Sequence, residues 1–455
     1  MTVSSSAGGT TPSSLYRAVW RWHFYAGLLS LPFLILLAVT GALYLFRDEI
    51  DGIVHRDLKQ VEITAAMPQA PSALIAAAVA SQPGAAALKY LPPATLTASA
   101  EVGVKTADGG KLSVFVDPYS GRVLGSLPDK GTVMGIVRRL HSLAYFGPVA
   151  NGVIEITGGW CILLTLTGVY LWWPRPRRGE PGGVLTVRGT PKRRVYWRDL
   201  HAVTGAVAGV FILFLAVSGM PWSVLWGNYV NQWANGHNFG YPNGVRVNVP
   251  MSDDHLEHTT WSLEQARVPE SPAPAADPIG IDAAVAAFNR LGMAPGYSIA
   301  LPNGPKGVYS ASVYPDNLSR QRVVHLDQYA GTPLLDMSYA DYGPLGKTLE
   351  WSINVHMGQE FGLANQLLML AVCLSIVTVA VSAGVMWWKR RPRGTLGVPP
   401  LPAERRMLWG VTAILMVGGV IFPLVGASFL AMLVFDAMVI RRKGGSWATS
   451  QTRLG

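Results

Sequence analysis

Five long apolar runs constrain the fold of this 455-residue chain more than any other feature of its sequence. They cover residues 24–46, 151–173, 202–226, 366–388 and 407–440, and each is long enough to cross the roughly 30 Å hydrocarbon core of a bilayer as a helix. Half of the residues are hydrophobic and only 14% are charged, a composition that excludes an ordinary soluble domain. The sequence therefore predicts an integral membrane protein.

The last of these runs is long enough for two short crossings. Phe422-Pro423 interrupts it, and the basic stretch Arg441–Lys443 follows it. A hairpin keeps that basic end in the cytoplasm, whereas one long crossing exports it, against the usual enrichment of Lys and Arg on the cytoplasmic side. We therefore expect about six transmembrane helices in all.

The positive charge is concentrated beside the predicted spans. The formal net charge of +10 could indicate nucleic-acid binding, but many basic residues lie between Arg175 and Arg198 and in the run Lys389–Arg393. Such loops are typical of the cytoplasmic side of a membrane protein. The sequence therefore predicts a multi-pass protein that contacts membrane lipid and no nucleic acid, with its amino terminus in the cytoplasm.

This topology divides the chain into spans, outer segments and cytoplasmic segments. They are a disordered tail (1–15), a first span (16–46), an outer segment (47–140), a second span (141–173), a basic loop (174–200), a third span (201–226), an outer segment (227–355), a fourth span (356–388), a cytoplasmic loop (389–406), a hairpin (407–440) and a cytoplasmic tail (441–455). The first tail holds no hydrophobic stretch, so it is interpreted as a tail and not as a signal peptide.

The spans are internally duplicated. In the first and third spans a histidine precedes one glycine by 4 residues and another by 18: His23, Gly27 and Gly41, then His201, Gly205 and Gly219. At the second and fourth spans a histidine precedes a glycine by 6 residues and a Trp-Trp pair by 31: His141, Gly147 and Trp172-Trp173, then His356, Gly362 and Trp387-Trp388. The glycines of the first and third spans indicate either room for a flat group or ordinary helix packing, and the Trp pairs are interpreted as interfacial anchors.

The two outer segments repeat a pattern of their own. A predicted helix is followed by a predicted strand in both: Ala70–Ser81 and Lys111–Asp117, then Ile281–Leu291 and Arg322–Asp327. Each strand enters the same Asp-x-Tyr-x-Gly turn, at 117–121 and at 327–331. We expect a small α+β domain in each segment.

Four of the nine histidines lie at the mouths of spans, in two pairs at matching depths. His23 and His201 lie at the cytoplasmic side, and His141 and His356 lie at the outer side. Two neutral imidazoles from facing helices are the axial ligands that a six-coordinate b-type haem needs. A histidine at a helix end is often only an interfacial residue, and duplication preserves spacing without function, so the haem hypothesis depends on residue type and paired depth.

Other metal and redox centres fit the sequence less well. The only cysteines, Cys161 and Cys373, lie in different apolar runs, which argues against disulfides, c-type haem and iron–sulfur clusters. Zinc or copper at the same histidines is an alternative, but the two pairs lie at opposite faces and cannot share one ion. Neither pair has an obvious Cys or carboxylate companion in its span.

Arginines accompany the histidines. Arg21, with Arg17 nearby, and Arg198 flank the inner pair, and Arg138 and Arg139 precede the outer one. Because guanidinium groups bind carboxylates well, Arg21, Arg198, Arg138 and Arg139 are candidates for binding haem propionates, with ordinary interfacial arginine as the alternative. An ionisable residue in the hairpin, Asp436, has no counterpart in the repeat, and no role is assigned to it.

Two stretches after the third span are candidates for binding a substrate. An aromatic stretch could receive a bulky chelate, although an interfacial belt explains its first three members equally well: Trp222, Trp226, Tyr229, Trp233, Phe239 and Tyr241. A second cluster offers metal-binding side chains but is interpreted as a solvated loop: Asp253, Asp254, His255, Glu257 and His258.

Residues 16–391 resemble the PepSY-associated transmembrane family in their four histidine-bearing spans, basic inner loops and repeated Asp-x-Tyr-x-Gly turn. Val114–Gly121 is similar to the end of a PepSY domain. The resemblance implies an α-helical membrane bundle with two α+β extracytoplasmic PepSY-like domains in a bacterial inner membrane. It also implies two b-type haems with His23, His201, His141 and His356 as axial ligands, as in the ferric-siderophore reductases of this family.

The implied activity is reduction of a ferric siderophore or other ferric chelate outside the membrane, with release of ferrous iron. Some relatives carry a fused flavodoxin- or ferredoxin-reductase-like domain. No nucleotide fingerprint follows Lys443, so we expect a separate reductase, a reduced flavin or a membrane quinol as electron donor. Two alternatives stay open: a non-enzymatic siderophore or iron transporter or binding protein, and a regulator whose outer domains restrain a periplasmic partner.

Overall fold

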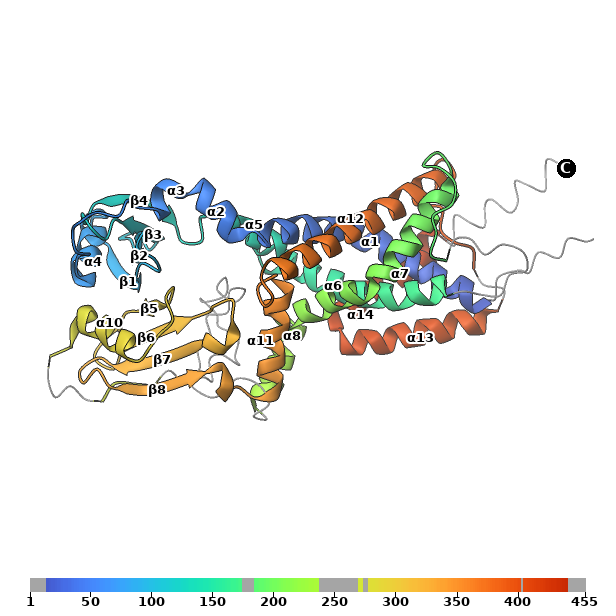
Figure 1. Ribbon diagram of the computed structural model, residues 1–455. Helices are drawn as coiled ribbons and strands as arrows, with labels where there is room; N and C mark the ends of the chain where they lie inside the picture. Colours follow the sequence, from blue (N-terminus) through green and yellow to red (C-terminus); the bar gives the residue numbers. More distant parts are fainter. Residues whose placement is uncertain (1–13, 174–183, 237–268, 273–276, 402–403, 441–455) are drawn as a thin grey trace, which may run out of the picture. The chain divides into compact units, whose positions relative to one another are not determined.

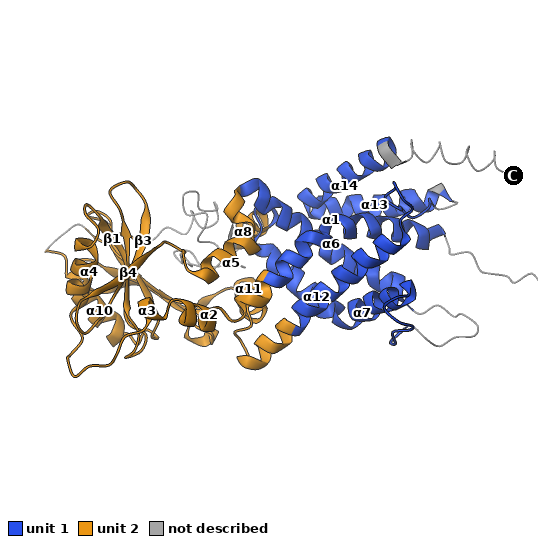
Figure 2. Cartoon of the chain, turned by 90° about the horizontal axis from the view of Figure 1, so that it is seen from above, with its two compact units in different colours: residues 1–39, 148–226, 371–455 blue, residues 40–147, 227–370 orange. Residues whose placement is uncertain are grey.

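The computed structural model describes residues 14–173, 184–236, 269–272, 277–401 and 404–440. The chain divides into two compact units, which Figure 2 colours separately. The helical unit comprises residues 1–39, 148–226 and 371–455, and the sheet unit comprises residues 40–147 and 227–370. Both units are therefore assembled from segments that are far apart in the sequence.

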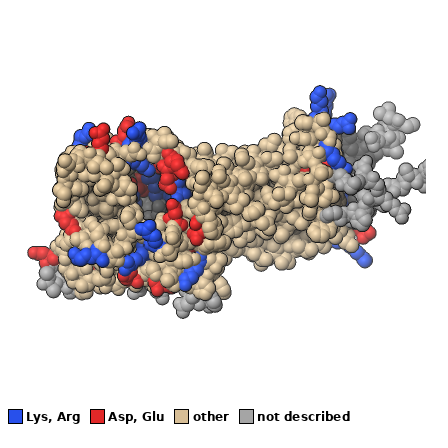
Figure 3. All heavy atoms as spheres, in the orientation of Figure 1, with Lys and Arg blue, Asp and Glu red and all other residues tan. Residues whose placement is uncertain are grey.

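Four helices are long and apolar enough to cross a membrane (Figure 1): α1 (Ser14–Tyr44), α6 (Pro148–Trp172), α7 (Arg194–Gly219, extended to Trp222 by a 3-10 turn) and α12 (Leu363–Arg390). A helix satisfies its own backbone hydrogen bonds, which lipid cannot do. On the face shown in Figure 3, the middle of the helical unit carries almost no charged side chains. Helices of sufficient length and hydropathy to cross a membrane are therefore present at the first four predicted spans.

The predicted hairpin consists of α13 (Arg405–Ile421) and α14 (Pro423–Phe435), followed by a π-helical turn (Asp436–Ile440). The helix breaks at Phe422, as expected for the residue before a proline. The two arms approach so closely that a Cβ on Gly419 would lie 2.5 Å from the Cα of Gly426. The predicted interruption is confirmed. Both arms are shorter than the four spans, and the total of six crossings stays a prediction.

The described part of the sheet unit contains one antiparallel sheet. Its strands are β1 (Ala86–Leu91), β2 (Ala100–Lys105), β3 (Lys111–Val116), β4 (Val123–Pro128), β5 (Ser298–Ala300), β6 (Val308–Val313), β7 (Arg322–Asp327) and β8 (Pro333–Ser338). They lie in the order β4-β3-β2-β1-β5-β6-β7-β8, and Tyr90 of β1 pairs with Ile299 of β5 at the centre. Each outer segment thus contributes half of a shared sheet, a relationship that the sequence does not predict.

Two helices, α4 (Pro71–Ala80) and α10 (Gly280–Arg290), cover one face of this sheet. Leu74 of α4 and Phe288 of α10 are almost fully buried in the same hydrophobic core. The backbone N–H and the hydroxyl of Ser72 donate to the Asp282 carboxylate at 2.8 and 2.6 Å, which links the helices. The predicted helices and strands of both segments are confirmed, whereas the boundaries of two separate domains stay predictions.

The repeated Asp-x-Tyr-x-Gly turn has the same structure in both copies. The Asp117 carboxylate accepts from the Tyr119 N–H at 2.9 Å, and the Asp327 carboxylate accepts from the Tyr329 N–H at 3.0 Å. The glycines, Gly121 and Gly331, have φ of 70° and 66°, a left-handed conformation that other residues rarely adopt. The turn predicted twice from the sequence is therefore confirmed twice.

Short helices complete the described chain: α2 (Arg47–Val54), α3 (Arg56–Lys59), α5 (Val133–His141), α8 (Trp226–Gly236) and α11 (Pro344–His356). Two of them, α5 and α11, end at the histidines with which the second and fourth spans were predicted to begin. The spans themselves start later, at Pro148 and Leu363. Each outer histidine therefore closes a short helix ahead of its span.

Candidate functional site

The inner histidines, His23 of α1 and His201 of α7, face each other in the helical unit. Their ring centroids are 6.4 Å apart and the ring planes are nearly perpendicular, at 88°. A metal ion bonded at about 2 Å to one nitrogen of each ring would hold the centroids roughly 6 Å apart. The separation of the two rings therefore suits two ligands of a single iron atom.

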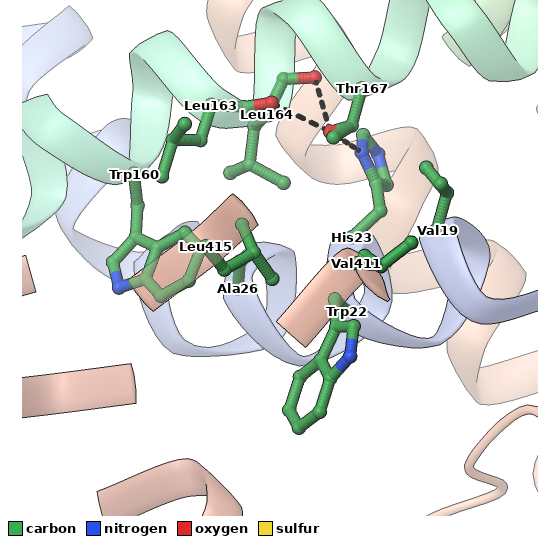
Figure 4. Close-up of a pocket in the computed structure, with 10 residues that line it drawn as sticks. All are labelled: Val19, Trp22, His23, Ala26, Trp160, Leu163, Leu164, Thr167, Val411 and Leu415. Carbon is green, nitrogen blue, oxygen red and sulfur yellow. Dashed lines mark hydrogen bonds between the residues drawn. The ribbon is translucent and has the colours of Figure 1, made fainter. Parts of the chain in front are cut away.

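Each inner histidine forms a hydrogen bond through Nδ1 to a neighbouring span. Nδ1 of His23 lies 2.9 Å from the Thr167 hydroxyl on α6 (Figure 4). Nδ1 of His201 lies 2.9 Å from the Val379 carbonyl and 3.4 Å from the Ser382 hydroxyl, both on α12. These contacts use Nδ1 of each ring, so Nε2 is the nitrogen that could bind a metal.

A small apolar pocket of about 20 Å³ adjoins His23 (Figure 4). Trp22 and Ala26 of α1, Trp160 of α6 and Leu415 of α13 contribute to its lining. This volume is far below the roughly 300–1,000 Å³ of typical ligand sites, and His201 is not among the lining residues. The pocket alone therefore cannot hold a macrocycle.

The glycines that accompany the inner histidines are not required by protein packing. A Cβ on Gly27 would meet its nearest neighbour, Leu164, at 3.9 Å, and a Cβ on Gly205 would meet Val379 at 3.9 Å. Both distances are ordinary van der Waals contacts. A methyl group would therefore fit at both positions, and the choice between room for a flat group and ordinary helix packing stays a prediction.

The outer histidines, His141 and His356, both belong to the sheet unit. Burial, with a smaller contribution from repulsion by His141, lowers the pKa of His356 to about 3. Nδ1 of His141 lies 2.9 Å from the Thr40 hydroxyl. Burial therefore favours the neutral form of the His356 imidazole, the form in which histidine binds a metal.

The four candidate arginines have partners within the protein. Arg21 is buried and forms an ion pair with Asp436, and it also donates to the Pro399 carbonyl. Arg198 contacts the adjacent carboxylate of Asp199, with Nε at 2.9 Å from Oδ1.

In the outer group, the Arg139 guanidinium stacks over the Tyr145 ring at 4.9 Å, and Arg138 precedes it in the last turn of α5. The predicted contacts of these arginines with propionates stay predictions. For Arg21 they would compete with the pair to Asp436, a residue to which the sequence assigned no role.

A second ionisable residue in the spans, Glu155, escaped the sequence analysis. It is buried in α6 and accepts hydrogen bonds from the N–H groups of Leu225 and Trp226 at 2.8 and 3.2 Å, at the start of α8. Its position as an acidic residue inside an apolar run was the sequence signal that could have identified it. Because it caps the first N–H groups of a helix, Glu155 has a structural explanation.

The aromatic candidates divide into anchors and exposed residues. Trp172 and Trp387 donate through Nε1 to the Val184 and Leu396 carbonyls at 2.8 and 2.9 Å, which agrees with anchoring. In the predicted substrate stretch, Trp226 packs against Phe422, whereas Tyr229 and Trp233 are exposed and Trp222 lies in the 3-10 turn that ends the third span. Phe239, Tyr241 and the cluster Asp253, Asp254, His255, Glu257 and His258 lie outside the described residues.

Within the described ranges, no group of three or more His, Cys, Asp or Glu side chains is arranged to hold a metal ion. Cys161 and Cys373 are both free and buried. Each histidine pair would supply two protein ligands to a metal, whereas a structural zinc site takes four.

Comparison with known proteins identifies the family. The family model for the PepSY-associated TM region matches residues 20–390, which include all four histidines, the three later spans and α1 from Trp20 onward. The hairpin of α13 and α14 lies beyond the matched region. No curated protein matches the chain.

Proposed function

Because the chain belongs to the PepSY-associated transmembrane family, we propose that it is a di-haem b electron-transfer protein that reduces a ferric chelate, such as a ferric siderophore, outside a bacterial inner membrane. The observation that carries the proposal is the 6.4 Å separation of the His23 and His201 rings on two different spans. Haem, when bound, would supply one-electron chemistry that no side chain of the pair possesses.

Three groups of residues would form the inner haem site: the histidine ligands, two glycines and surrounding apolar side chains. His23 and His201 offer one ring nitrogen each, and hydrogen bonds to Thr167 and Val379 orient their rings. Gly27 and Gly205 each leave the space of a methyl group on their helix surfaces. Buried apolar residues such as Trp22 and Trp160 exclude water from the site. The resulting low local dielectric constant would tune the reduction potential of a bound haem.

The outer site would use His141 and His356, the last residues of the short helices α5 and α11 of the sheet unit. The low pKa of His356 keeps this imidazole neutral at physiological pH, as ligation requires. In this proposal the outer pair would hold a haem that supplies the electron for the chelate, and no residue acts as acid, base or nucleophile.

The overall reaction transfers one electron to each ferric ion, which leaves as ferrous iron because chelates that prefer ferric iron bind the reduced ion weakly. The electron comes from a donor on the other side, which we propose to be a separate reductase protein, a reduced flavin or a membrane quinol. Tyr229 and Trp233 are exposed aromatic residues of the kind that contacts organic chelates.

The proposal is tested by single-turnover reduction of a ferric hydroxamate. The purified protein is reduced with dithionite, separated from the reductant and mixed without oxygen with the chelate and a chromogenic ferrous trap. We expect about two ferrous ions per chain, one for each haem, and about one or fewer for His201→Ala. A protein that binds the chelate but forms no ferrous iron would contradict reductase activity and favour the receptor alternative.

A further inference from the structure

The hydrogen-bond directions around the inner histidines follow from the partners. The Thr167 hydroxyl has one proton, and it lies 2.7 Å from the Leu163 carbonyl in its own helix, to which it donates. The oxygen therefore accepts from Nδ1–H of His23 at 2.9 Å. For His201 the direction is unambiguous, because the Val379 carbonyl at 2.9 Å can only accept.

Both inner rings consequently carry their proton on Nδ1. In a neutral imidazole the other nitrogen, Nε2, then holds the free lone pair that bonds to a metal. Ligating histidines almost always donate their second ring N–H in this way, and removal of the acceptor typically costs about 10–100-fold in metal affinity.

The hydroxyl partners occupy equivalent positions in the internal repeat. Thr167 follows His141 by 26 residues, and Ser382 follows His356 by 26 residues. Ser382 donates to the Val379 carbonyl at 2.9 Å, so its oxygen faces Nδ1 of His201 at 3.4 Å as an acceptor. A hydroxyl residue on the following span therefore stands beside the inner histidine in both halves of the duplication.

The two halves of the duplication nevertheless differ in how strongly the hydroxyl residue contacts the inner histidine. His23 relies on the Thr167 side chain, which mutation can remove. His201 has the Val379 backbone carbonyl at 2.9 Å and only a longer contact to Ser382, at 3.4 Å. The orientation of His201 is thus secured by the backbone, and that of His23 by one side chain.

We infer that Thr167 is the positioning residue that holds His23 as its Nδ1–H tautomer with Nε2 directed to a metal, and that Ser382 is a weaker, partly redundant counterpart for His201. The inference rests on the proposed function for the identity of the metal group. Its structural content, the tautomer, is independent of that group.

The test combines two measurements on matched variants. Thr167→Val removes the acceptor at nearly constant volume, and Thr167→Ser restores it. Thr165→Val is the control, because Thr165 lies on the same helix and its hydroxyl donates to the Cys161 carbonyl in the same manner without contacting a histidine. Ser382→Ala tests the asymmetry.

The first measurement is the nitrogen-15 NMR spectrum of histidine in the haem-free protein, with the His23 signals assigned by their loss in His23→Gln. We expect the Nδ1–H tautomer in the wild type, Thr167→Ser and Thr165→Val, and a mixture or the Nε2–H tautomer in Thr167→Val. An unchanged His23 tautomer in Thr167→Val would overturn the inference.

The second measurement is haem titration of the inner site in a His141→Ala background. We expect the dissociation constant to rise about 10–100-fold for Thr167→Val and less than tenfold for Ser382→Ala. Equal affinities in Thr167→Val and Thr165→Val would overturn the positioning role. No haem binding by the parent, with an intact Nδ1–H tautomer, would instead contradict the proposed function and leave the tautomer assignment supported.

Discussion

Arg21 of the first span and Asp436 at the end of α14 form a buried ion pair, so the C-terminal hairpin is linked by charge to the helix that carries His23. Tyr25 donates a hydrogen bond to the same carboxylate at 2.5 Å. The hairpin also contributes Val411 and Leu415 to the pocket beside His23. Although it lies outside the region that matches the family, the hairpin is therefore part of the surroundings of the inner histidine.

Asp436→Asn should destabilise the protein strongly. Removal of one charge leaves Arg21 buried without its counter-ion, which costs about 3–5 kcal/mol in comparable pairs. Thermal unfolding in detergent measures the effect. The control is Glu270→Gln, which breaks the exposed ion pair with Lys306 and should leave the unfolding temperature unchanged. Equal, small effects of the two changes would contradict a structural role for the buried pair.

Gly121→Ala and Gly331→Ala should each destabilise the sheet unit by about 1–2 kcal/mol, because both glycines have a left-handed backbone at the end of the duplicated turn. Gly52→Ala is a control for which we expect the opposite change in stability. Gly52 lies inside α2 with open space where a Cβ would stand, and its replacement should stabilise the helix by about 0.5–1 kcal/mol. Chemical denaturation distinguishes the signs, and a neutral result at both turn glycines would argue against their shared role.

Leu74→Ala should weaken both halves of the sheet. Leu74 belongs to the first outer segment, yet its core includes residues of β6 and β7, so the loss of about 2–5 kcal/mol should appear in all of these strands. Hydrogen exchange followed by mass spectrometry would report reduced protection in β6 and β7 as well as in β2 and β3. Leu96→Ala, at an exposed position of the same segment, should have little effect. Loss of protection confined to β1–β4 would mean that the segments are independent.

Much of this fold is encoded in local patterns that a single sequence displays. Long apolar runs predict the four spans, Phe422-Pro423 predicts the break in the hairpin, and the repeated turn predicts where β3 and β7 end. The pairing of β1 with β5 was not predictable in this way, since the two strands are some two hundred residues apart and either segment could have formed its own sheet.

In the candidate site, too, features that depend on local sequence were predictable, and contacts between distant segments were not. The histidine repeat identifies His23 and His201 as a pair, and their rings do lie together. Thr167 and Ser382 were missed, although their equal spacing from His141 and His356 was a usable signal. The partners of Arg21 and His201 depend on which spans pack side by side, which residue type and spacing alone do not specify.

The two-haem proposal is tested most directly by the optical spectrum of the detergent-purified protein, reduced with dithionite minus oxidised, with haem quantified per chain. We expect about two b-type haems in the wild type, and about one in each of His23→Ala and His141→Ala. A wild type that contains no haem and cannot be reconstituted with it would contradict the proposal.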